Sequence, residues 1–226
     1  MRIGLFGGAF NPIHRCHLTI ADQVRERLSL DQILFIPTGT PPHKRADTLA
    51  PADHRLEMVR LAIHGHPGFA VSDLEIQRPG NSYSVDTVTS LQSRYGPGTD
   101  LLFLIGLDAF LQISTWHRPS DLLHACRFVV FGRPGQMFRL VAGLPLLPPL
   151  RLEGLEALDS GRADRLDVPE EGRRGITLLR LPPCPISASD IRERVRGGRS
   201  LTDLLPPQVE SYIIQAKLYR EDTDHA

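Results

Sequence analysis

The stretch RIGLFGGAFNPIHRCH, residues 2–17, decides the fold. Residues 2–6 form a short apolar run that enters the pair Gly7-Gly8, a pattern typical of a buried strand that ends in a tight turn. Over residues 17–28 apolar side chains recur at helical spacing, with charged residues between them. The stretch therefore predicts a strand, a glycine turn and a helix in succession.

The same alternation continues along the chain. Further apolar runs predict strands, at 32–36, 101–105, 127–131 and 176–181. Segments with helical spacing predict helices, at 53–63, 84–94, 187–195 and 207–219. Residues 69–76 are expected to be extended, and residues 38–51 to form a polar loop.

Short strands of continuous apolar character are typical of a parallel sheet that is covered on both faces. We therefore expect an α/β, Rossmann-like, doubly wound parallel sheet. One domain is expected over residues 1–226, with a small C-terminal helical part at 183–220. Residues 136–175 have no clean period and predict an irregular surface segment or a loosely packed helix.

Composition excludes several classes of protein. Lys and Arg number 26, as do Asp and Glu, so the formal net charge is zero, which argues against a protein that coats nucleic acid or an anionic membrane. Glycine and proline, 19 each among 226 residues, stay below the level typical of low-complexity disorder. A local basic site for a phosphorylated small molecule remains compatible with these values.

The cysteines and the apolar stretches bear on the compartment. Cys16, Cys126 and Cys184 are widely spaced and form no CxxC pair, which argues against a disulfide framework or a zinc ribbon and favours a reducing cytosol. The N-terminal residues lack the pattern of a signal peptide, and the longest apolar stretch, 140–150, is too short to span a bilayer. We expect a cytoplasmic protein, and the sequence leaves a homo-oligomer open.

The loop at residues 7–17 is the first candidate site, since ligands of open parallel sheets bind beyond the carboxyl ends of the strands. It is neither a Walker loop nor a GxGxxG fingerprint, so a nicotinamide-dependent dehydrogenase loses its main support. Its two glycines permit close approach of a ligand, and His14 and His17 are three residues apart. Phosphate binding, a turn with two partly exposed histidines, and a metal site of His14, Cys16 and His17 all stay open.

The second candidate follows the run at 101–105. Gly106 and Asp108 suit backbone approach to a nucleoside, with a carboxylate near its hydroxyls, but Asp108 could equally cap a short helix. Trp116, the only tryptophan, is either a core residue or a ring that stacks on a ligand.

Two basic segments complete the candidates. At residues 185–192 Ser187 or Ser189 could cap a helix, and Arg192 in its first turns could clamp a phosphate bidentately. At residues 38–45 a loop brings Lys44 and its neighbours next to a strand end. A solvated surface is the alternative interpretation of both.

Taken together, the clusters resemble the nucleotidyltransferases of the HxGH type. Gly-Gly-x-Phe-x-Pro-x-His stands at the start, and Ile-Ser-x-Ser-x-Ile-Arg near the end. Within that superfamily the chain is similar to the bacterial nicotinate-nucleotide adenylyltransferases. The closer match rests on residues 41–44, 82–87, 105–108 with Trp116, and 133–135, which follow the family's order over almost the whole chain.

The resemblance implies that ATP and nicotinate mononucleotide give nicotinate adenine dinucleotide and pyrophosphate, with Mg²⁺ and with no metal held by the protein alone. It implies small-molecule substrates and no nucleic acid or membrane partner. His14, His17 and Arg192 would be catalytic. ATP would be bound by Gly8, Phe10, His14, His17, Gly106, Asp108, Ser189 and Arg192, and nicotinate mononucleotide by Ala9, Lys44, Thr87 and Trp116.

One position departs from the family pattern, because the glycine between the two histidines is Cys16 here. We expect an active enzyme with weakened ATP binding and a thiol open to oxidation. Three alternatives stay open: the same chemistry on nicotinamide mononucleotide or phosphopantetheine, a non-catalytic nucleotide-binding protein, and an oxidoreductase on the same sheet.

Overall fold

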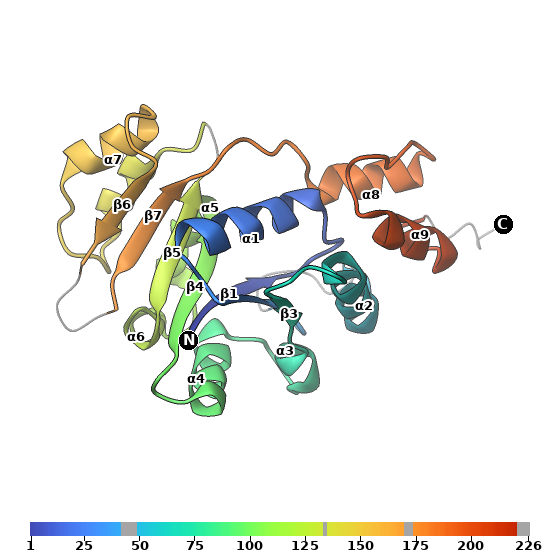
Figure 1. Cartoon of the computed structure of the whole chain (residues 1–226), viewed down its shortest axis with the longest axis horizontal. Helices are drawn as coiled ribbons and strands as arrows, with labels where there is room; N and C mark the ends of the chain where they lie inside the picture. The colour runs from blue at the N-terminus through green and yellow to red at the C-terminus, as the bar shows by residue number, and fades with distance from the viewer. Residues whose placement is uncertain (42–48, 133–134, 170–173, 221–226) are drawn as a thin grey trace. The chain divides into compact units, whose positions relative to one another are not determined.

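The computed structural model describes residues 1–41, 49–132, 135–169 and 174–220 (Figure 1). The chain forms two compact units. Unit 1 comprises Met1–Gly7, Arg25–Ile33 and Tyr83–Cys184, and unit 2 comprises Gly8–Val24, Leu34–Ser82 and Pro185–Ala226. Each unit therefore combines segments that lie far apart in the sequence.

A seven-stranded sheet has the order β3 (Phe69–Val71), β2 (Gln32–Pro37), β1 (Arg2–Gly8), β4 (Asp100–Gly106), β5 (Arg127–Gly132), β7 (Ile176–Arg180) and β6 (Arg165–Val168). The strands β1 (Arg2–Gly8), β4 (Asp100–Gly106), β5 (Arg127–Gly132) and β7 (Ile176–Arg180) pair in parallel, in the order β1-β4-β5-β7. The order reverses at β1, as in doubly wound sheets, whose ligands bind at such a switch point. The α/β Rossmann-like fold expected from the sequence is confirmed.

Most expected elements form within a residue or two of their expected bounds. The helices are α1 (Arg15–Arg27), α2 (Ala52–Ile63), α4 (Ser84–Tyr95) and α8 (Ala188–Arg196), and the remaining early strand is β2 (Gln32–Pro37). In α1 and α4 the buried residues recur at helical spacing, because the apolar stripe faces the core, whereas α8 buries Ile191 alone. The last helix, α9 (Pro207–Gln215), packs against α2 and ends four residues before the expected end (Figure 1).

Two segments differ from expectation. The extended segment at 69–76 is only partly a strand, β3 (Phe69–Val71), and then turns into α3 (Leu74–Gln77). Residues 136–175 contain η3 (Phe138–Gly143), α7 (Leu152–Asp159) and β6 (Arg165–Val168), which pairs antiparallel with β7. The sequence hid β6 because an edge strand with one solvated face carries alternating Arg165 and Asp167 instead of an apolar run.

Three short helices complete the described elements: α5 (Leu107–Phe110), η2 (Ile113–Thr115) and α6 (Pro119–Ala125). In unit 1 aromatic rings join strand and helix, since Phe128 lies 5.3 Å from Phe103 and 5.7 Å from Phe110 between ring centroids. In unit 2 Phe35 lies 5.8 Å from Phe10 and 5.3 Å from Phe69. Each unit thus has its own aromatic core.

The cysteines correct one expectation. Cys16 and Cys184 are each disulfide-bonded, and Cys126 is a free, buried cysteine. The expectation of a free thiol at Cys16 is therefore wrong. The cysteines also no longer support the expectation of a reducing compartment. Sequence spacing gave no signal for a disulfide, because a pairing between distant residues depends on how the chain folds. Over the described ranges, every helix is too short or too polar to cross a bilayer.

Candidate active site

The turn between β1 and α1 is tightly packed. The ring of Phe10 folds back over Gly8, where an added Cβ would lie 3.2 Å from the ring. Phe10 has a φ of 44°, in the left-handed region that few residues other than glycine adopt. Phe10 is buried, so its ring shapes the floor of the turn while the backbone of Gly8 and Ala9 stays partly exposed. The main chain of Gly8 and Ala9 is therefore accessible at this turn.

The two histidines lie together at the start of α1. Their ring centroids are 3.8 Å apart, and the ring of His17 also meets Phe10 edge-on at 5.1 Å. The His14 backbone N–H donates to His17 Nδ1 at 3.2 Å. Since Nδ1 is the acceptor, a neutral His17 carries its proton on Nε2. His14 is 5% exposed. The two rings are therefore held against each other, and Nε2 is the donor nitrogen of a neutral His17.

Helix α8 brings a serine and an arginine to the same turn. Ser187 is the N-cap, and its hydroxyl accepts from the Asp190 N–H at 3.1 Å. The guanidinium of Arg192 donates to the backbone carbonyl of Asn11 at 2.8 Å and to the Ser189 hydroxyl at 3.2 Å. The cap therefore belongs to Ser187 and leaves Ser189 exposed beside Arg192. Within unit 2, the Arg192–Asn11 bond thus joins two motifs across a separation of 181 residues in the sequence.

Arg55, which is only 2% exposed, was not among the site residues expected from the sequence. It donates to three backbone carbonyls, of Ala50 at 2.9 Å, Ala9 at 2.9 Å and Gly39 at 3.1 Å. Burial lowers the pKa of Arg55, whereas the Tyr219 phenol and the Glu75 carboxylate raise it. A signal was present, because Arg55 lies four residues before Val59 and so on the apolar face of the expected helix, where a charge is unusual.

Gly39 explains why Arg55 can reach the second loop. An added Cβ at Gly39 would collide with the backbone carbonyl of Glu75 and lie 3.2 Å from the Ser82 hydroxyl. Only glycine permits this close approach of the two backbones. The loop after β2 thus lies directly against α3, and Arg55 holds its Gly39 carbonyl.

The predicted adenosine residues lie in unit 1, at the end of β4. Gly106 is the N-cap of α5 by backbone conformation, and Asp108 lies in the first turn of that helix, so the interpretation of Asp108 as the cap is wrong. A Cβ at Gly106 would lie 2.7 Å from the Asp108 carboxylate. The glycine therefore leaves the space that this exposed carboxylate occupies.

The residues predicted to bind nicotinate mononucleotide differ in burial and lie in different units. Thr87 is 1% exposed, and its hydroxyl donates to the Tyr83 carbonyl at 3.3 Å. Trp116 is half-buried and meets Phe103 edge-on at 6.2 Å. Both lie in unit 1, and Ala9 lies in unit 2. Lys44 lies outside the described residues.

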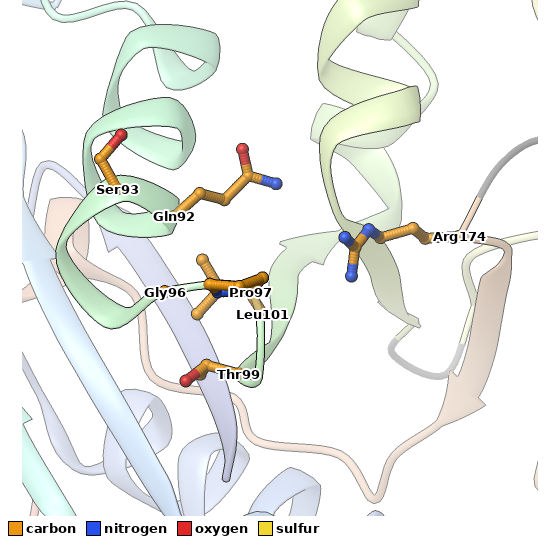
Figure 2. Close-up of a pocket in the computed structure, with 7 residues that line it drawn as sticks. All are labelled: Gln92, Ser93, Gly96, Pro97, Thr99, Leu101 and Arg174. Atoms are coloured by element: carbon orange, nitrogen blue, oxygen red, sulfur yellow. The ribbon is translucent and has the colours of Figure 1, made fainter.

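A pocket of about 310 Å³ lies away from these residues in unit 1 (Figure 2). It is lined by the C-terminal end of α4, the start of β4 and Arg174, whose guanidinium faces the pocket. Ligands of parallel sheets bind at the carboxyl ends of the strands, whereas this pocket lies at the amino end of β4. It is therefore not the candidate active site.

Metal ligands are sparse in the part of the chain that the structure describes. There, no three His, Cys, Asp or Glu side chains gather as a cation site. A metal site of His14, Cys16 and His17 also fails because Cys16 is disulfide-bonded. The donor set is instead one of ring N–H, guanidinium and backbone N–H groups, which suits anionic oxygens.

Comparison with known proteins gives the family. The cytidylyltransferase-like family model matches residues 5–194. The probable nicotinate-nucleotide adenylyltransferase of Pelobacter propionicus is 41% identical over 222 residues, covering 98% of this chain and 99% of its relative. The protein of the same name from Moorella thermoacetica is 39% identical over 224 residues, covering 99% and 94%.

Solved structures agree in fold. The nicotinic acid mononucleotide adenylyltransferase of Plasmodium falciparum, complexed with NaAD, matches with a TM-score of 0.70 and 18% identity over 96% of this chain and 97% of that one. The same enzyme complexed with APC matches with a TM-score of 0.68, at 18% identity and 96% coverage of both chains. At this identity the likeness establishes the fold alone.

Proposed function

The chain belongs to the nicotinate-nucleotide adenylyltransferases of the cytidylyltransferase-like family, and from this membership we propose how its residues work. The enzyme transfers the adenylyl group of ATP to nicotinate mononucleotide, forming nicotinate adenine dinucleotide and pyrophosphate. We propose that both units belong to one nucleotidyltransferase domain, which is consistent with a family match that includes segments of each.

In the proposed mechanism the substrate supplies the nucleophile. A phosphate oxygen of nicotinate mononucleotide attacks the α-phosphorus of ATP, and the bond from that phosphorus to the bridging oxygen breaks as pyrophosphate leaves. The protein has to position the two nucleotides and stabilise charge on the transferring group. This agrees with a site that offers hydrogen-bond donors.

We assign the phosphate contacts to unit 2. His17 would donate through Nε2, since its Nδ1 already accepts from the backbone of His14. Arg192 would present its guanidinium, held by Asn11 and Ser189, to phosphate oxygens. The Arg192–Asn11 hydrogen bond is the observation that best supports this assignment, because it joins both sequence motifs.

The remaining assignments follow the family pattern. Gly8 and Phe10 would border ATP, and Gly106 and Asp108 would hold its adenosine. Ala9, Lys44, Thr87 and Trp116 would hold the acceptor. The hydroxyl and the backbone N–H of Thr87 both already donate to the Tyr83 carbonyl, so its assignment rests on the family pattern alone.

Mg²⁺ would enter as the complex with ATP, because Mg²⁺ commonly keeps several waters and binds substrate phosphates. The described residues form no cluster that would hold it alone. Chelation should therefore stop turnover and leave the melting temperature of the free protein unchanged. A fall in that temperature on adding EDTA would indicate a protein-held metal. We also propose that the reaction is cytoplasmic, because its co-substrate is ATP.

The deciding experiment measures pyrophosphate release from Mg-ATP with three acceptors in turn. These are nicotinate mononucleotide, its amide and phosphopantetheine. We expect the highest kcat/KM with nicotinate mononucleotide. A higher value with another acceptor would reassign the substrate, and ATP binding without release from any of them would leave a binding protein.

A further inference from the structure

The segment that follows α9 returns to the turn after β1, and its last described tyrosine makes contact there. The phenol of Tyr219 donates to the side-chain carbonyl of Asn11 at 2.9 Å. The same Asn11 oxygen accepts from the backbone N–H of Ala50 at 3.0 Å. Asn11 is 5% exposed, so these bonds are made away from water. Tyr219 is thus joined to the residue whose backbone carbonyl holds Arg192.

The backbone at this point is also specialised. Leu218 is buried and its N–H donates to the Ile213 carbonyl at 3.0 Å, which ends the helix. Lys217 and Tyr219 have φ values of 52° and 62°, in the left-handed region. Such conformations cost energy in residues other than glycine and persist where surrounding contacts hold them. The turn directs the phenol of Tyr219 to Asn11.

The charges around the phenol keep it a donor. Burial raises the pKa of Tyr219, and the guanidinium groups of Arg192 and Arg55 oppose this shift. The net pKa lies above its ordinary value, so the phenol is protonated at neutral pH. The two arginines that shape the phenol's surroundings are the same two that bind the backbone of Ala9 and Asn11.

We propose that Tyr219 is a positioning residue, which acts on ATP through Asn11 by fixing the carbonyl that orients Arg192. The inference rests on the proposed contact of Arg192 with the ATP phosphates. Without the phenol, the Asn11 side chain loses a hydrogen bond that anchors it, and the Asn11 backbone carbonyl moves more freely. Arg192 then spends less time in the orientation that meets a phosphate.

The test is Tyr219→Phe, which removes only the hydroxyl. One hydrogen bond corresponds to about a three- to tenfold effect, so we expect kcat/KM for ATP to fall and the ATP dissociation constant by calorimetry to rise by that factor. The KM for nicotinate mononucleotide should stay within about twofold. The matched control is Tyr212→Phe on α9, whose hydroxyl meets His54 at 2.8 Å, and it should change neither ATP constant.

A double-mutant cycle with Arg192→Ala distinguishes positioning from a purely structural role. If Tyr219 acts through Arg192, the Tyr219→Phe effect on ATP affinity should vanish in the Arg192→Ala background. An unchanged effect there, or equal melting-temperature losses in both tyrosine variants with unchanged ATP constants, would overturn the inference. ATP affinity is measured without nicotinate mononucleotide, so the result does not depend on which acceptor nucleotide the enzyme uses. Failure of turnover in the wild type would refute the proposed function and not the role of the Tyr219–Asn11 hydrogen bond.

Discussion

The turn after β1 and the turn after β4 both follow a parallel strand that ends in glycine, yet they are built differently. In the first, Asn11 and His14 are each 5% exposed. Side chains from α2 and α8 bind its backbone carbonyls, and Tyr219 of the C-terminal segment binds the Asn11 side chain. In the second, Asp108 is exposed and is placed by the space that Gly106 leaves. The first turn is fixed by the fold, and the second depends on local backbone shape.

This difference agrees with the proposed roles, in which the first turn binds phosphate groups and the second holds the adenosine. Stabilising the charge on a transferring adenylyl group requires donors that are already oriented, so that their reorientation does not add to the barrier. Holding an adenosine requires less accurate geometry, because that part of the substrate does not react. The following changes test whether the two turns differ in this way.

His17→Ala should have the largest effect. Removing one oriented donor to a developing charge costs about 10²–10³-fold in kcat, and we expect a loss of that size. The fold should survive, since the ring is only half-buried. Steady-state kinetics and the melting temperature measure the two effects, with exposed His64→Ala as the control. Near-normal turnover in His17→Ala would remove the phosphate role from the first turn.

Arg55→Met tests how far the first turn depends on buried support. Three carbonyls lose their donor, and each unsatisfied buried group costs about 1–3 kcal/mol, so unfolding in urea should show a loss of at least about 3 kcal/mol. Arg60→Met is the matched control on the same helix: its ion pair with Glu57, at 3.7 Å, is exposed and contributes less than about 1 kcal/mol. Equal losses in both variants would mean that the first turn is not held by Arg55.

Gly106→Ala tests the second turn. The added Cβ would lie 2.7 Å from the Asp108 carboxylate, which is exposed and can move aside. We expect the KM for ATP to rise about threefold to tenfold, as for loss of one hydrogen bond, with little change in stability. Gly98→Ala, where an added Cβ meets no atom within 4 Å, should leave this KM unchanged. A large loss of stability in Gly106→Ala would mean that the second turn is as rigid as the first.

The ionisation of the Cys126 thiol should have the smallest effect on the free energy of unfolding at neutral pH. It lies in unit 1, where burial raises its thiol pKa to about 12 from the usual 9.0. The unfolded chain loses this proton first as pH rises, so the contribution to stability is complete below about pH 9 and is lost towards pH 12. Urea unfolding from pH 7 to 10 checks the direction, and Cys126→Ala should show a shallower decline above pH 9. A thiol reagent at pH 8 should react with Cys126 only after unfolding.

Parts of the fold and of the site were predictable. The β1–α1 stretch, the apolar strands and the helix at Ser84–Tyr95 follow from periodicity, because a buried face imposes its spacing on the sequence. His14, His17, Ser189 and Arg192 were found from their motifs, and the structure brings them together in unit 2. Their roles toward substrate remain predictions.

Other features had no local pattern. The edge strand β6 carries charges on its solvated side, and the bonding of Cys16 and Cys184 concerns residues far apart in the chain. Tyr219 and Asn11 are separated by 208 residues. A hydrogen bond of that kind leaves no periodicity in the sequence, since neither partner's neighbours are constrained by it.

The sequence by itself determined the alternation of strand and helix, the glycine turns at the strand ends, and the family, because each depends on local spacing or on ordered motifs. Only the tertiary structure decided that Arg55 and Tyr219 support the first turn and that Ser187 caps α8. These depend on which backbone carbonyls and N–H groups meet once the core has closed, and a buried donor can be recognised only when its acceptors are in place.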